Sequence, residues 1–340
     1  MHIQHDVSLK YYNTFGIDVN ARDFISFDTD DALEEIFVTI PAINKDKRLV
    51  LGGGSNILLS RDFDGYVLKN DIGGIEKITE DDDYVWLKAG AGVPWHQLVF
   101  FAVDHGWGGI ENMSLIPGSC GAAPMQNIGA YGVELKDVFD SLEAYHVKDK
   151  ARVVFSHQDC AFGYRESVFK HLLRDQFVIT SITLRLQKKP IFHTAYGAIR
   201  QELDKMHITE LSVKAISEAV IRIRSSKLPD PKKIGNAGSF FKNPSVTKEA
   251  HDRLKNEYPQ LISFTNSDGS YKLAAGWLIE QCGWKGYRKG DAGCYPLQAL
   301  VLVNYGTASG AEILQLSEEI QSSVFQKFGV QLEREVNLIS

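Results

Sequence analysis

Residues 48–56 read RLVLGGGSN, an apolar run that meets three consecutive glycines. The apolar residues predict a strand, and the glycines predict a turn directly after it. Adjacent glycines can expose a row of backbone N–H groups, which suits a diphosphate, and the last two residues add side-chain donors. We therefore expect a phosphate-binding loop made of Gly52, Gly53, Gly54, Ser55 and Asn56.

A second stretch of small residues, 116–132, reads IPGSCGAAPMQNIGAYG and is uncharged. It could pack its backbone flat against an extended cofactor, although a buried, irregular connection in a sheet domain would look similar. Because no GxGxxG motif follows a strand, two such loops favour a dinucleotide held by a fold other than the Rossmann fold. The expected lining residues are Ile116, Pro117, Gly118, Gly121, Ala122, Gln126, Asn127, Gly129, Ala130, Tyr131 and Gly132.

The run GNAGSFFKNP at 235–244 places one hydroxyl, Ser239, between a flexible approach and an apolar pair. Such runs are usually turns and paired phenylalanines are usually core, but a dry hydroxyl beside a cation and an amide also resembles a site. The neighbourhood is basic in a protein of net charge −6, which suggests a small anionic ligand rather than a nucleic acid. Its basic residues are Arg222, Arg224, Lys227, Lys232, Lys233 and Lys242, against the single acid Asp230.

The composition is that of a globular protein of two or three domains, with 340 residues, of which 44% are hydrophobic and 24% charged. No apolar run approaches the ~18 residues of a membrane span, and the N-terminus lacks the apolar core of a secretory signal. The ten histidines form no ligand cluster, so we predict no metal. The cysteines, which form no CxxC pair and fit a reducing cytoplasm, are Cys120, Cys160, Cys282 and Cys294.

Periodicity predicts a chain of mixed helices and strands. The predicted helices are 30–40, 94–106, 211–227, 246–257, 272–282 and 309–328; the predicted strands include 84–92, 177–186, 298–304 and 330–339. KLPDP at 227–231 breaks the chain at a predicted domain boundary. In the last strand, Arg334 is expected on the same face as the apolar residues, and Glu333 and Glu335 on the other face.

Ten motifs, in order and correctly spaced, identify the chain as similar to a known family. The chain resembles the UDP-N-acetylenolpyruvoylglucosamine reductases, flavin enzymes often called MurB, in their longer, type I form. The motifs are NTFGID at 13–18, LGGGSN at 51–56, GIEN at 109–112, IPG at 116–118, QNIGAYGVEL at 126–135, FGYRESVFK at 162–170, KLPDP at 227–231, GNAGSFFKNP at 235–244, KLAAGWLIEQ at 272–281 and QALVLVN at 298–304.

The resemblance implies an α+β fold, with a two-part FAD-binding domain of the vanillyl-alcohol-oxidase (PCMH) type and a C-terminal α/β substrate-binding domain. Residues 1–67, joined by a C-terminal strand at 329–340, would form the first FAD-binding subdomain. Residues 68–226 would form the second, with a substrate loop near 190–200, and 227–328 would bind substrate. FAD would be held without a covalent tether by the two small-residue loops.

The resemblance also implies two half-reactions in peptidoglycan precursor synthesis. NADPH, a co-substrate, would reduce the flavin, and UDP-N-acetylglucosamine enolpyruvate would take the hydride and become UDP-N-acetylmuramate. The carbon beside the carboxylate then needs a proton, and Ser239 matches the family's donor. Arg165 matches the residue that pairs with the carboxylate and stabilises the enolate, and Glu335 matches a neutral acid or hydrogen-bond partner.

Substrate contacts carry over to Tyr164, Tyr196, Lys227, Asn243 and Gln298. Tyr196 matches the tyrosine whose loop folds over the UDP moiety, while Tyr131 and Tyr164 could instead contact the flavin or fill core space. The chain departs from the family at two points. Arg334 replaces a common proline between the two glutamates, and the acidic residue that often follows the Tyr-Gly pair is absent from HTAYGAI at 193–199.

Two other functions stay open. An oxidase of the same fold would often tether FAD through a histidine near the glycine run, but no histidine lies between 49 and 95. A protein that binds nucleotide sugar or flavin without turnover is disfavoured because Ser239, Arg165 and Glu335 are all present. We expect a cytoplasmic monomer from a bacterium that builds a cell wall, with no nucleic-acid partner and no membrane insertion.

Overall fold

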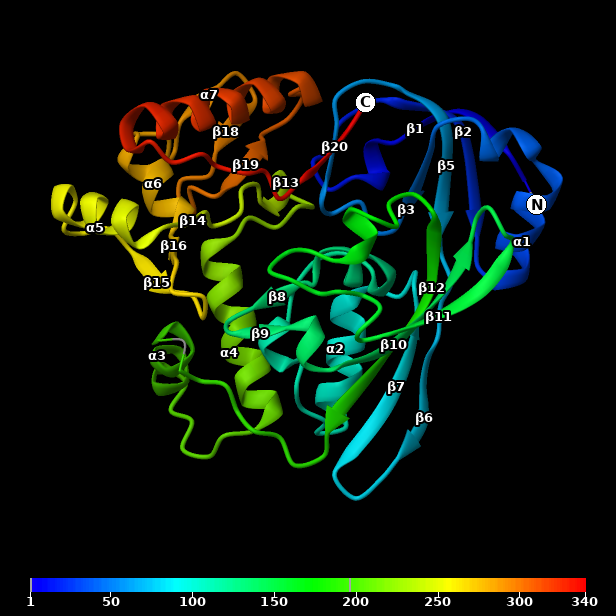
Figure 1. Cartoon of the computed structure of the whole chain (residues 1–340), viewed down its shortest axis with the longest axis horizontal. Helices are drawn as coiled ribbons and strands as arrows, with labels where there is room; N and C mark the ends of the chain where they lie inside the picture. Colours follow the sequence, from blue (N-terminus) through cyan, green and yellow to red (C-terminus); the bar gives the residue numbers. More distant parts are fainter. Residues whose placement is uncertain (1, 196) are drawn as a thin grey trace. The chain divides into compact units, whose positions relative to one another are not determined.

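The computed structural model describes residues 2–195 and 197–340, which combine helices with mostly antiparallel sheets (Figure 1). The predicted α+β class is confirmed. The chain divides into two units: the first comprises residues up to 7, 21–54 and 64–226, and the second comprises 8–20, 55–63 and 227–340. One division lies between Ser226 and Lys227, at the predicted break. The separation of the first 226 residues into two subdomains stays a prediction.

Strands of the first unit form a mixed sheet, an antiparallel sheet and a hairpin. The mixed sheet has the order β1-β2-β5-β3, where β1 is Gln4–Ser8, β2 Asn20–Phe27, β5 Phe63–Asn70 and β3 Arg48–Leu51. The antiparallel sheet has the order β11-β10-β12-β7-β6, where β11 is Ala151–Ser156, β10 Phe139–His146, β12 Phe177–Gln187, β7 Tyr84–Gly90 and β6 Ile75–Glu80. The hairpin joins β8 (Gly129–Ala130) to β9 (Val133–Glu134).

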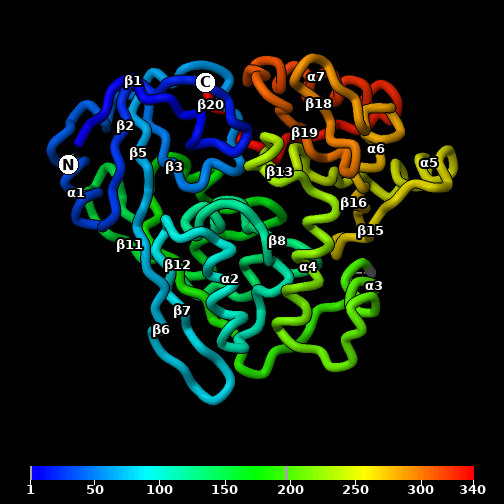
Figure 2. The backbone as a smooth tube through the Cα atoms, turned by 180° about the vertical axis from the view of Figure 1, so that it is seen from behind, coloured from blue at the N-terminus to red at the C-terminus, as the bar shows by residue number. Residues whose placement is uncertain are grey.

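Helices of the first unit are α1 (Asp30–Thr39), α2 (Trp95–Asp104), α3 (Gly197–Lys205) and α4 (Val213–Lys227). One face of α2 packs on the five-stranded sheet, where Leu98 and Val99 share a buried core with Leu87 and Leu184 (Figures 1 and 2). Short 3-10 turns occur in this unit at Pro41–Asn44, Glu111–Met113, Cys120–Ala122, Pro124–Gln126, Leu135–Asp137 and Val168–Lys170. The sheet and α2 thus form the support for the loop 116–132.

Local sequence signals explain where these helices begin. The Thr29 hydroxyl accepts a hydrogen bond from the Ala32 N–H at 3.1 Å, and the Ser212 hydroxyl accepts one from the Ala215 N–H at 3.1 Å. Each satisfies a donor that the first helical turn leaves unpaired. The predicted apolar face of α4 is confirmed, since Val213, Ile216, Val220 and Ile223 are all buried.

The second unit consists of short strands covered by helices. Its sheets have the orders β13-β19-β18-β17, β14-β16-β15 and β20-β4. The strands are β4 (Ile57–Leu59), β13 (Gly235–Ser239), β14 (Ser245–Val246), β15 (Ser263–Thr265), β16 (Tyr271–Leu273), β17 (Arg288–Lys289), β18 (Ala292–Cys294), β19 (Val301–Asn304) and β20 (Asn337–Ile339). The helices are α5 (Lys248–Glu257), α6 (Ala275–Gln281) and α7 (Gly310–Phe328), and a 3-10 turn lies at Lys10–Tyr12.

Segment 8–20, from near the N-terminus, is built into the second unit. The Asn304 side chain donates to the carbonyl of Phe15 at 3.0 Å, and the Asn236 N–H donates to the carbonyl of Thr14 at 3.0 Å. A Cβ on Gly235 would lie 2.2 Å from the Phe15 oxygen, so only glycine permits this approach. The segment therefore packs directly on β13, the strand that carries Ser239.

The predicted strand at 330–339 is only partly correct. Ladder pairing is confined to β20, which runs parallel to β4, and to an isolated bridge between Phe241 and Arg334. The partner segment near the bridge is short because Pro244, which has no N–H, follows it. The predicted alternation nevertheless holds, since Leu332 and Val336 are buried whereas Glu333 is exposed.

Candidate active-site residues

Ser239 is the last residue of β13 and follows a β-bulge. Asn236 faces Val303 and Ser239 faces Val301, so two residues of β13 stand opposite one residue of β19. Gly238 has a φ of +69°, which favours glycine, and its N–H donates to the Asn236 side chain at 3.0 Å. Because a bulge re-aims the side chain beside it, the glycine that we expected to be flexible instead fixes the direction of the serine.

Two buried rings hold the chain directly after Ser239. Phe240 and Phe241 pack edge to face with ring centroids 5.3 Å apart, and Phe240 also contacts Phe15 at 6.1 Å. The Phe240 N–H donates to the Leu300 carbonyl at 2.7 Å, which continues the pairing with the β19 side. The predicted rigid apolar pair is confirmed, and it anchors the half-buried serine.

Glu335 lies on the segment that pairs with the residues after Ser239. Its N–H donates to the Phe240 carbonyl at 2.8 Å, and the Lys242 N–H donates to the Glu333 carbonyl at 2.8 Å. In this antiparallel register Glu335 stands opposite Phe240, one position from Ser239. The second unit therefore brings together two of the three predicted catalytic residues.

Asn56 bonds to the same segment. Its side-chain nitrogen donates to the Glu335 carbonyl at 3.2 Å, and its own carbonyl accepts from the Asn337 N–H at 3.0 Å. The division between the two units falls inside the predicted phosphate-binding run, with Gly54 in the first unit and Ser55 in the second. Asn56, expected to bind cofactor, thus lies next to the predicted catalytic glutamate.

Two predicted substrate residues meet at the start of α6. The side-chain oxygen of Asn243 accepts from the N–H of the first residue of α6 at 3.0 Å. A Cβ on Gly276 would lie 3.1 Å from the side-chain oxygen of Gln298. The structure therefore places both amide side chains at one helix terminus, whereas the predicted substrate residue Tyr196 lies outside the described residues.

In the first unit, the glycine run lies against the second small-residue loop. A Cβ on Gly53 would come within 3.0 Å of the Gly118 Cα, and one on Gly52 would come within 2.1 Å of the Ser119 hydroxyl. Gly54 and Gly118 have φ values of +60° and +111°, which other residues rarely adopt. The two loops were predicted separately, and the structure places them in contact.

Loop 116–132 is an irregular connection, but it is not buried throughout. It contains two 3-10 turns and β8, the first strand of the β8–β9 hairpin. Asn127 is buried; its side chain donates to the Gly163 carbonyl at 2.9 Å and accepts from the Lys136 N–H at 3.0 Å. The other predicted residues are half-buried or exposed, which leaves them accessible to a ligand: Ile116, Pro117, Gly118, Gly121, Ala122, Gln126, Gly129, Ala130, Tyr131 and Gly132.

Arg165 contacts this loop directly. Its guanidinium donates to the Gly129 carbonyl at 2.8 Å and to the Asn127 carbonyl at 3.3 Å, and it lies 5.4 Å from the centroid of the Tyr164 ring. Arg165 and Tyr131 have φ values of +58° and +50°, a strained conformation for non-glycine residues that is concentrated at functional sites. The first unit thus joins a predicted catalytic arginine to the predicted cofactor loop.

Arg224 on α4 is a further candidate, although we did not expect a site role for it individually. Its Nε is buried and has no hydrogen-bond partner among the described residues. Burial lowers the pKa of Arg224, and the Tyr131 hydroxyl has a smaller opposing effect. Tyr131 packs against the same core as α4. A buried cation with an unpaired donor beside this loop indicates a place for an electron-rich ligand group.

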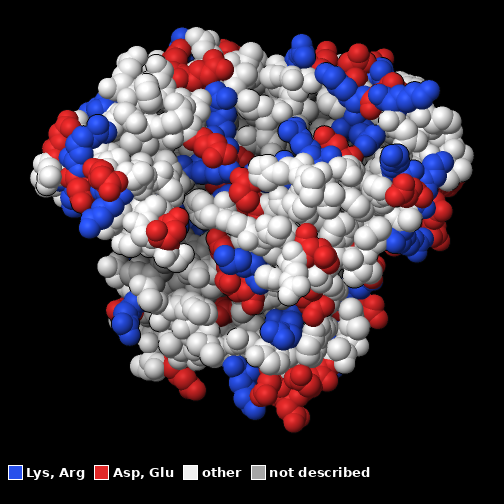
Figure 3. Space-filling view, in the orientation of Figure 1, with Lys and Arg blue, Asp and Glu red and all other residues white. Residues whose placement is uncertain are grey.

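The basic residues at 222–242 do not form one uniform patch. Lys242 is buried and its Nζ lies 2.6 Å from a Glu333 oxygen, whereas Lys227, Lys232 and Lys233 are exposed. On the face in Figure 3, basic and acidic side chains are interspersed. The three lysines, together with exposed Arg222, are accessible to an anionic substrate group.

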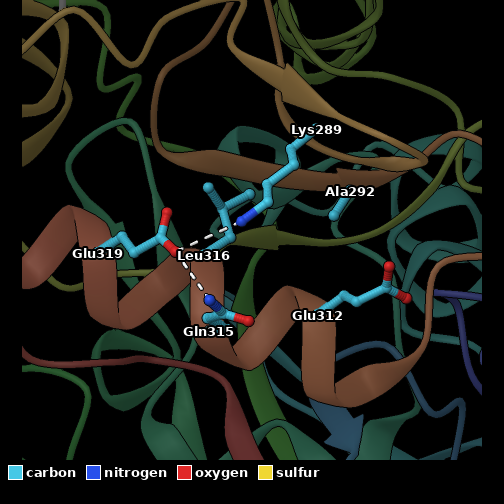
Figure 4. A pocket seen from close by; sticks show the side chains of 6 residues that line it. All are labelled: Lys289, Ala292, Glu312, Gln315, Leu316 and Glu319. Carbon is cyan, nitrogen blue, oxygen red and sulfur yellow. Dashed lines mark hydrogen bonds and ion pairs between the residues drawn. The ribbon is translucent and has the colours of Figure 1, made fainter.

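A small cavity of about 40 Å³ lies beside α7 but contains none of the predicted site residues. Glu319 accepts a hydrogen bond from Gln315 at 3.0 Å and lies 3.9 Å from the Lys289 Nζ (Figure 4). The cavity is large enough for only about one water molecule or little more. This cavity is therefore not among the candidate site regions, which are the loops of the first unit and, separately, the strands of the second.

Other classes of site are not seen within 2–195 and 197–340. No group of three or more His, Cys, Asp or Glu residues there could hold a metal ion. None of the helices in these ranges is long and apolar enough to cross a bilayer. The four cysteines are free thiols, and burial raises the pKa of Cys160 and of Cys294 to about 12, so neither is a ready nucleophile.

Comparison with family models divides the chain in two. Residues 27–151 match the model of an FAD-binding domain. Residues 230–339 match the C-terminal domain of UDP-N-acetylenolpyruvoylglucosamine reductase. Both loops of the first unit begin within the first match, and Ser239 and Glu335 lie within the second.

Full-length relatives carry the same name. The reductase of Flavobacterium johnsoniae is 48% identical over 340 residues, and that of Amoebophilus asiaticus is 49% identical over 339; each alignment covers 100% of both chains. The crystal structure of UDP-N-acetylenolpyruvylglucosamine reductase from Thermus caldophilus is 25% identical, covers 100% of both chains and has a TM-score of 0.68.

Proposed function

The chain belongs to the UDP-N-acetylenolpyruvoylglucosamine reductase family, and we propose that it uses NADPH to reduce UDP-N-acetylglucosamine enolpyruvate to UDP-N-acetylmuramate. Members are FAD-dependent oxidoreductases, also called UDP-N-acetylmuramate dehydrogenases. The observation that carries the proposal is the pairing of Phe240, the residue directly after Ser239, with Glu335, inside the family's C-terminal domain. NADPH as reductant and the roles of individual residues are part of the proposal.

The residues of the first unit suit FAD. The Gly53–Gly118 approach leaves no room for a side chain, so the two loops can present backbone groups to a diphosphate. The buried, unpaired Nε of Arg224 offers a donor to a ring edge held near Tyr131. When bound, FAD supplies hydride transfer between NADPH and the substrate alkene.

Ser239 is proposed as the proton donor. Hydride addition at the terminal alkene carbon leaves negative charge on the carbon beside the carboxylate, and the Ser239 hydroxyl gives that carbon its proton. The serine then regains a proton from water, so the overall reaction consumes one proton. The bulge at Gly238 and the buried ring of Phe240 hold the hydroxyl in one direction, which limits the entropy lost in reaching the transition state.

Charge and binding are assigned to the other residues. Arg165 is proposed to neutralise the substrate carboxylate and the developing enolate, where a fixed cation has a large effect. Glu335 is proposed to hydrogen-bond the intermediate beside Ser239. Tyr164, Tyr196, Lys227, Asn243 and Gln298 are proposed to bind substrate, with exposed Lys227 on a phosphate or carboxylate.

An anaerobic experiment tests the function. Purified protein is mixed with NADPH, its flavin spectrum is followed, and UDP-N-acetylglucosamine enolpyruvate is then added. We expect bleaching followed by return of the oxidised spectrum, with UDP-N-acetylmuramate as product. Bleaching that reverses only in air would support an oxidase, and protein that takes up no FAD would contradict the cofactor assignment.

A further inference from the structure

Arg334, the residue between the two C-terminal glutamates, turns its side chain towards α7. Its Nε donates to the Ser317 hydroxyl at 2.9 Å, and its terminal nitrogen lies 3.6 Å from a Glu318 oxygen. The side chain is only 21% exposed, although arginine is usually solvated. Burial lowers the pKa of Arg334, so a strong local contact is needed to hold the charged group there.

The hydrogen bond to Ser317 has a defined direction. Ser317 is fully buried, and its single hydroxyl proton is donated to the Leu314 carbonyl at 2.6 Å. The oxygen lone pairs are therefore the groups that meet Arg334, so the serine acts as acceptor. Gln321, further along α7, donates to the Leu332 carbonyl at 2.7 Å and holds the same segment at a second point.

Alternation along the segment links this contact to Glu335. Neighbouring residues in extended chain point to opposite faces, so a residue fixed towards α7 directs the next residue away from it. Leu332 and Val336 share the α7-facing side with Arg334, and both are buried. A slip of one residue would exchange the faces of Arg334 and Glu335. Backbone pairing opposite this stretch is short, with one bridge between Phe241 and Arg334 and one hydrogen bond on each side of it, so the contact between Arg334 and Ser317 adds a side-chain restraint on the register.

We propose that Arg334 is a positioning residue, whose hydrogen bond to Ser317 on α7 directs the Glu335 side chain to the face that carries the reaction. This inference rests on the proposed function of Glu335. In this proposal Arg334 contacts no reacting atom, and it acts only by fixing the direction of the Glu335 side chain.

A double-mutant cycle tests the proposal. The variants Arg334→Met and Ser317→Ala are each made in the native chain and in Glu335→Gln. In the native chain we expect Arg334→Met to lower kcat roughly tenfold, with KM changed less than about twofold, because an interaction made mainly in the transition state is lost. In the Glu335→Gln chain the same change should cost less than about twofold, because the two residues act as one unit. Arg334→Lys should restore part of the loss.

Two outcomes would overturn the inference: no loss in the native chain, or an equal loss in both backgrounds. Arg253→Met serves as matched control, since Arg253 is exposed on α5 in the same unit. Ser317→Ala removes the same contact from the side of α7. Because alanine favours helices, this variant should fold even if Arg334→Met does not.

A readout without turnover separates this inference from the proposed function. Hydrogen exchange of the peptide containing the Glu335 N–H should accelerate at least about fivefold in Arg334→Met and in Ser317→Ala, because local opening governs exchange. Arg253→Met should leave it unchanged. Unaltered exchange in the first two variants would refute the positioning role, whereas an inactive native enzyme would refute only the reductase assignment.

Discussion

The hydroxyl of Ser239 sits directly after a bulge and before two buried rings, so its removal should leave its surroundings intact. In Ser239→Ala, we expect NADPH to reduce the flavin at the native rate, while reoxidation by UDP-N-acetylglucosamine enolpyruvate slows by about 100-fold or more. Stopped-flow absorbance measures both steps. Ser245→Ala, at an exposed serine of β14, is the control. Product formation within a few-fold of native would exclude Ser239 as donor.

The hydrogen bond of His96 directly before loop 116–132 should make the stability of the protein depend on pH. Its Nδ1 accepts a hydrogen bond from the Leu115 N–H at 2.9 Å, which requires that nitrogen to be unprotonated. Burial lowers the pKa of His96 below its ordinary 6.5, and Arg224 lowers it further. Because the folded-state pKa is the lower one, this stabilisation is present above pH 6.5 and is lost as the pH falls through the folded-state pKa.

Melting temperatures measured from pH 8 to pH 5 check this expectation. The fall in melting temperature between pH 6.5 and pH 5 should be smaller in His96→Asn than in the native chain. His207→Asn, at an exposed histidine whose φ of +56° suits asparagine, should follow the native curve. Identical curves for native chain and His96→Asn would show that His96 does not titrate in this range.

Residue-level structure was predictable where a motif was local. The ten residues at 235–244 predicted a rigid apolar pair after Ser239, and the structure confirms that Phe240 and Phe241 are buried, while the role of Ser239 stays a prediction. Arg224 was placed in a general basic cluster, although a helical projection carries the missing signal. It follows Val220 by four residues and Ile216 by eight, so it lies within the apolar stripe of α4. A buried arginine needs a hydrogen-bond acceptor or an opposite charge nearby, and the sequence did not indicate which group would supply it.

At the scale of elements, the contact between the two glycine loops leads to a stability prediction. A Cβ on Gly53 would meet three backbone atoms of residues 118 and 119 at 3.0 to 3.5 Å, and backbone cannot rotate away. We expect Gly53→Ala to lower the free energy of unfolding by about 1–3 kcal/mol and to weaken FAD binding. Gly73→Ala, whose nearest neighbour would be 4.0 Å away, should change neither. Chemical denaturation and flavin titration measure the two effects.

Helices were easier to predict than strands. The helix expected at 309–328 begins at Gly310, with Ser309 and Glu312 forming a capping box, and ends at Phe328. Such signals lie within a few residues of the terminus that they define. β10 gave no comparable signal, because it is held by pairing with β11 on one side and β12 on the other, and its own residues alternate only irregularly between buried and exposed. The same limit explains why residues 330–336 were wrongly expected to continue a strand.

At the scale of the whole molecule, the second unit cannot be separated by one cut at residue 226. Its strand β13 bonds to Thr14, and β20 pairs with β4. We expect a fragment of residues 227–340 to lack a cooperative thermal transition and to give poorly dispersed amide NMR signals, since it leaves these backbone groups unpaired. The same residues within the full chain are the control. A sharp melt of the isolated fragment would contradict this expectation.

The boundary near 227 could be read from the sequence because Pro229 and Pro231 interrupt a helix that ends at Lys227. The assignment of 8–20 and 55–63 to the second unit could not be read in this way. These segments have ordinary composition, and their membership follows from contacts with residues more than 200 positions away, such as Asn304 with Phe15. The division of the run 52–56 between the two units, after Gly54, likewise follows from such distant contacts and could not be predicted from the sequence.

The pairing of β4 with β20 has a consequence for synthesis on the ribosome. Ser60, directly after β4, donates to the carbonyl of Ile339, which lies 279 residues later. At a translation rate of roughly 5–20 residues per second, β20 is synthesised about 15–55 s after β4. During that interval an apolar strand edge stays open to the wrong neighbour. The nascent protein should therefore depend on chaperones until its final residues emerge, and the loss of even a few C-terminal residues should reduce yield before it reduces activity.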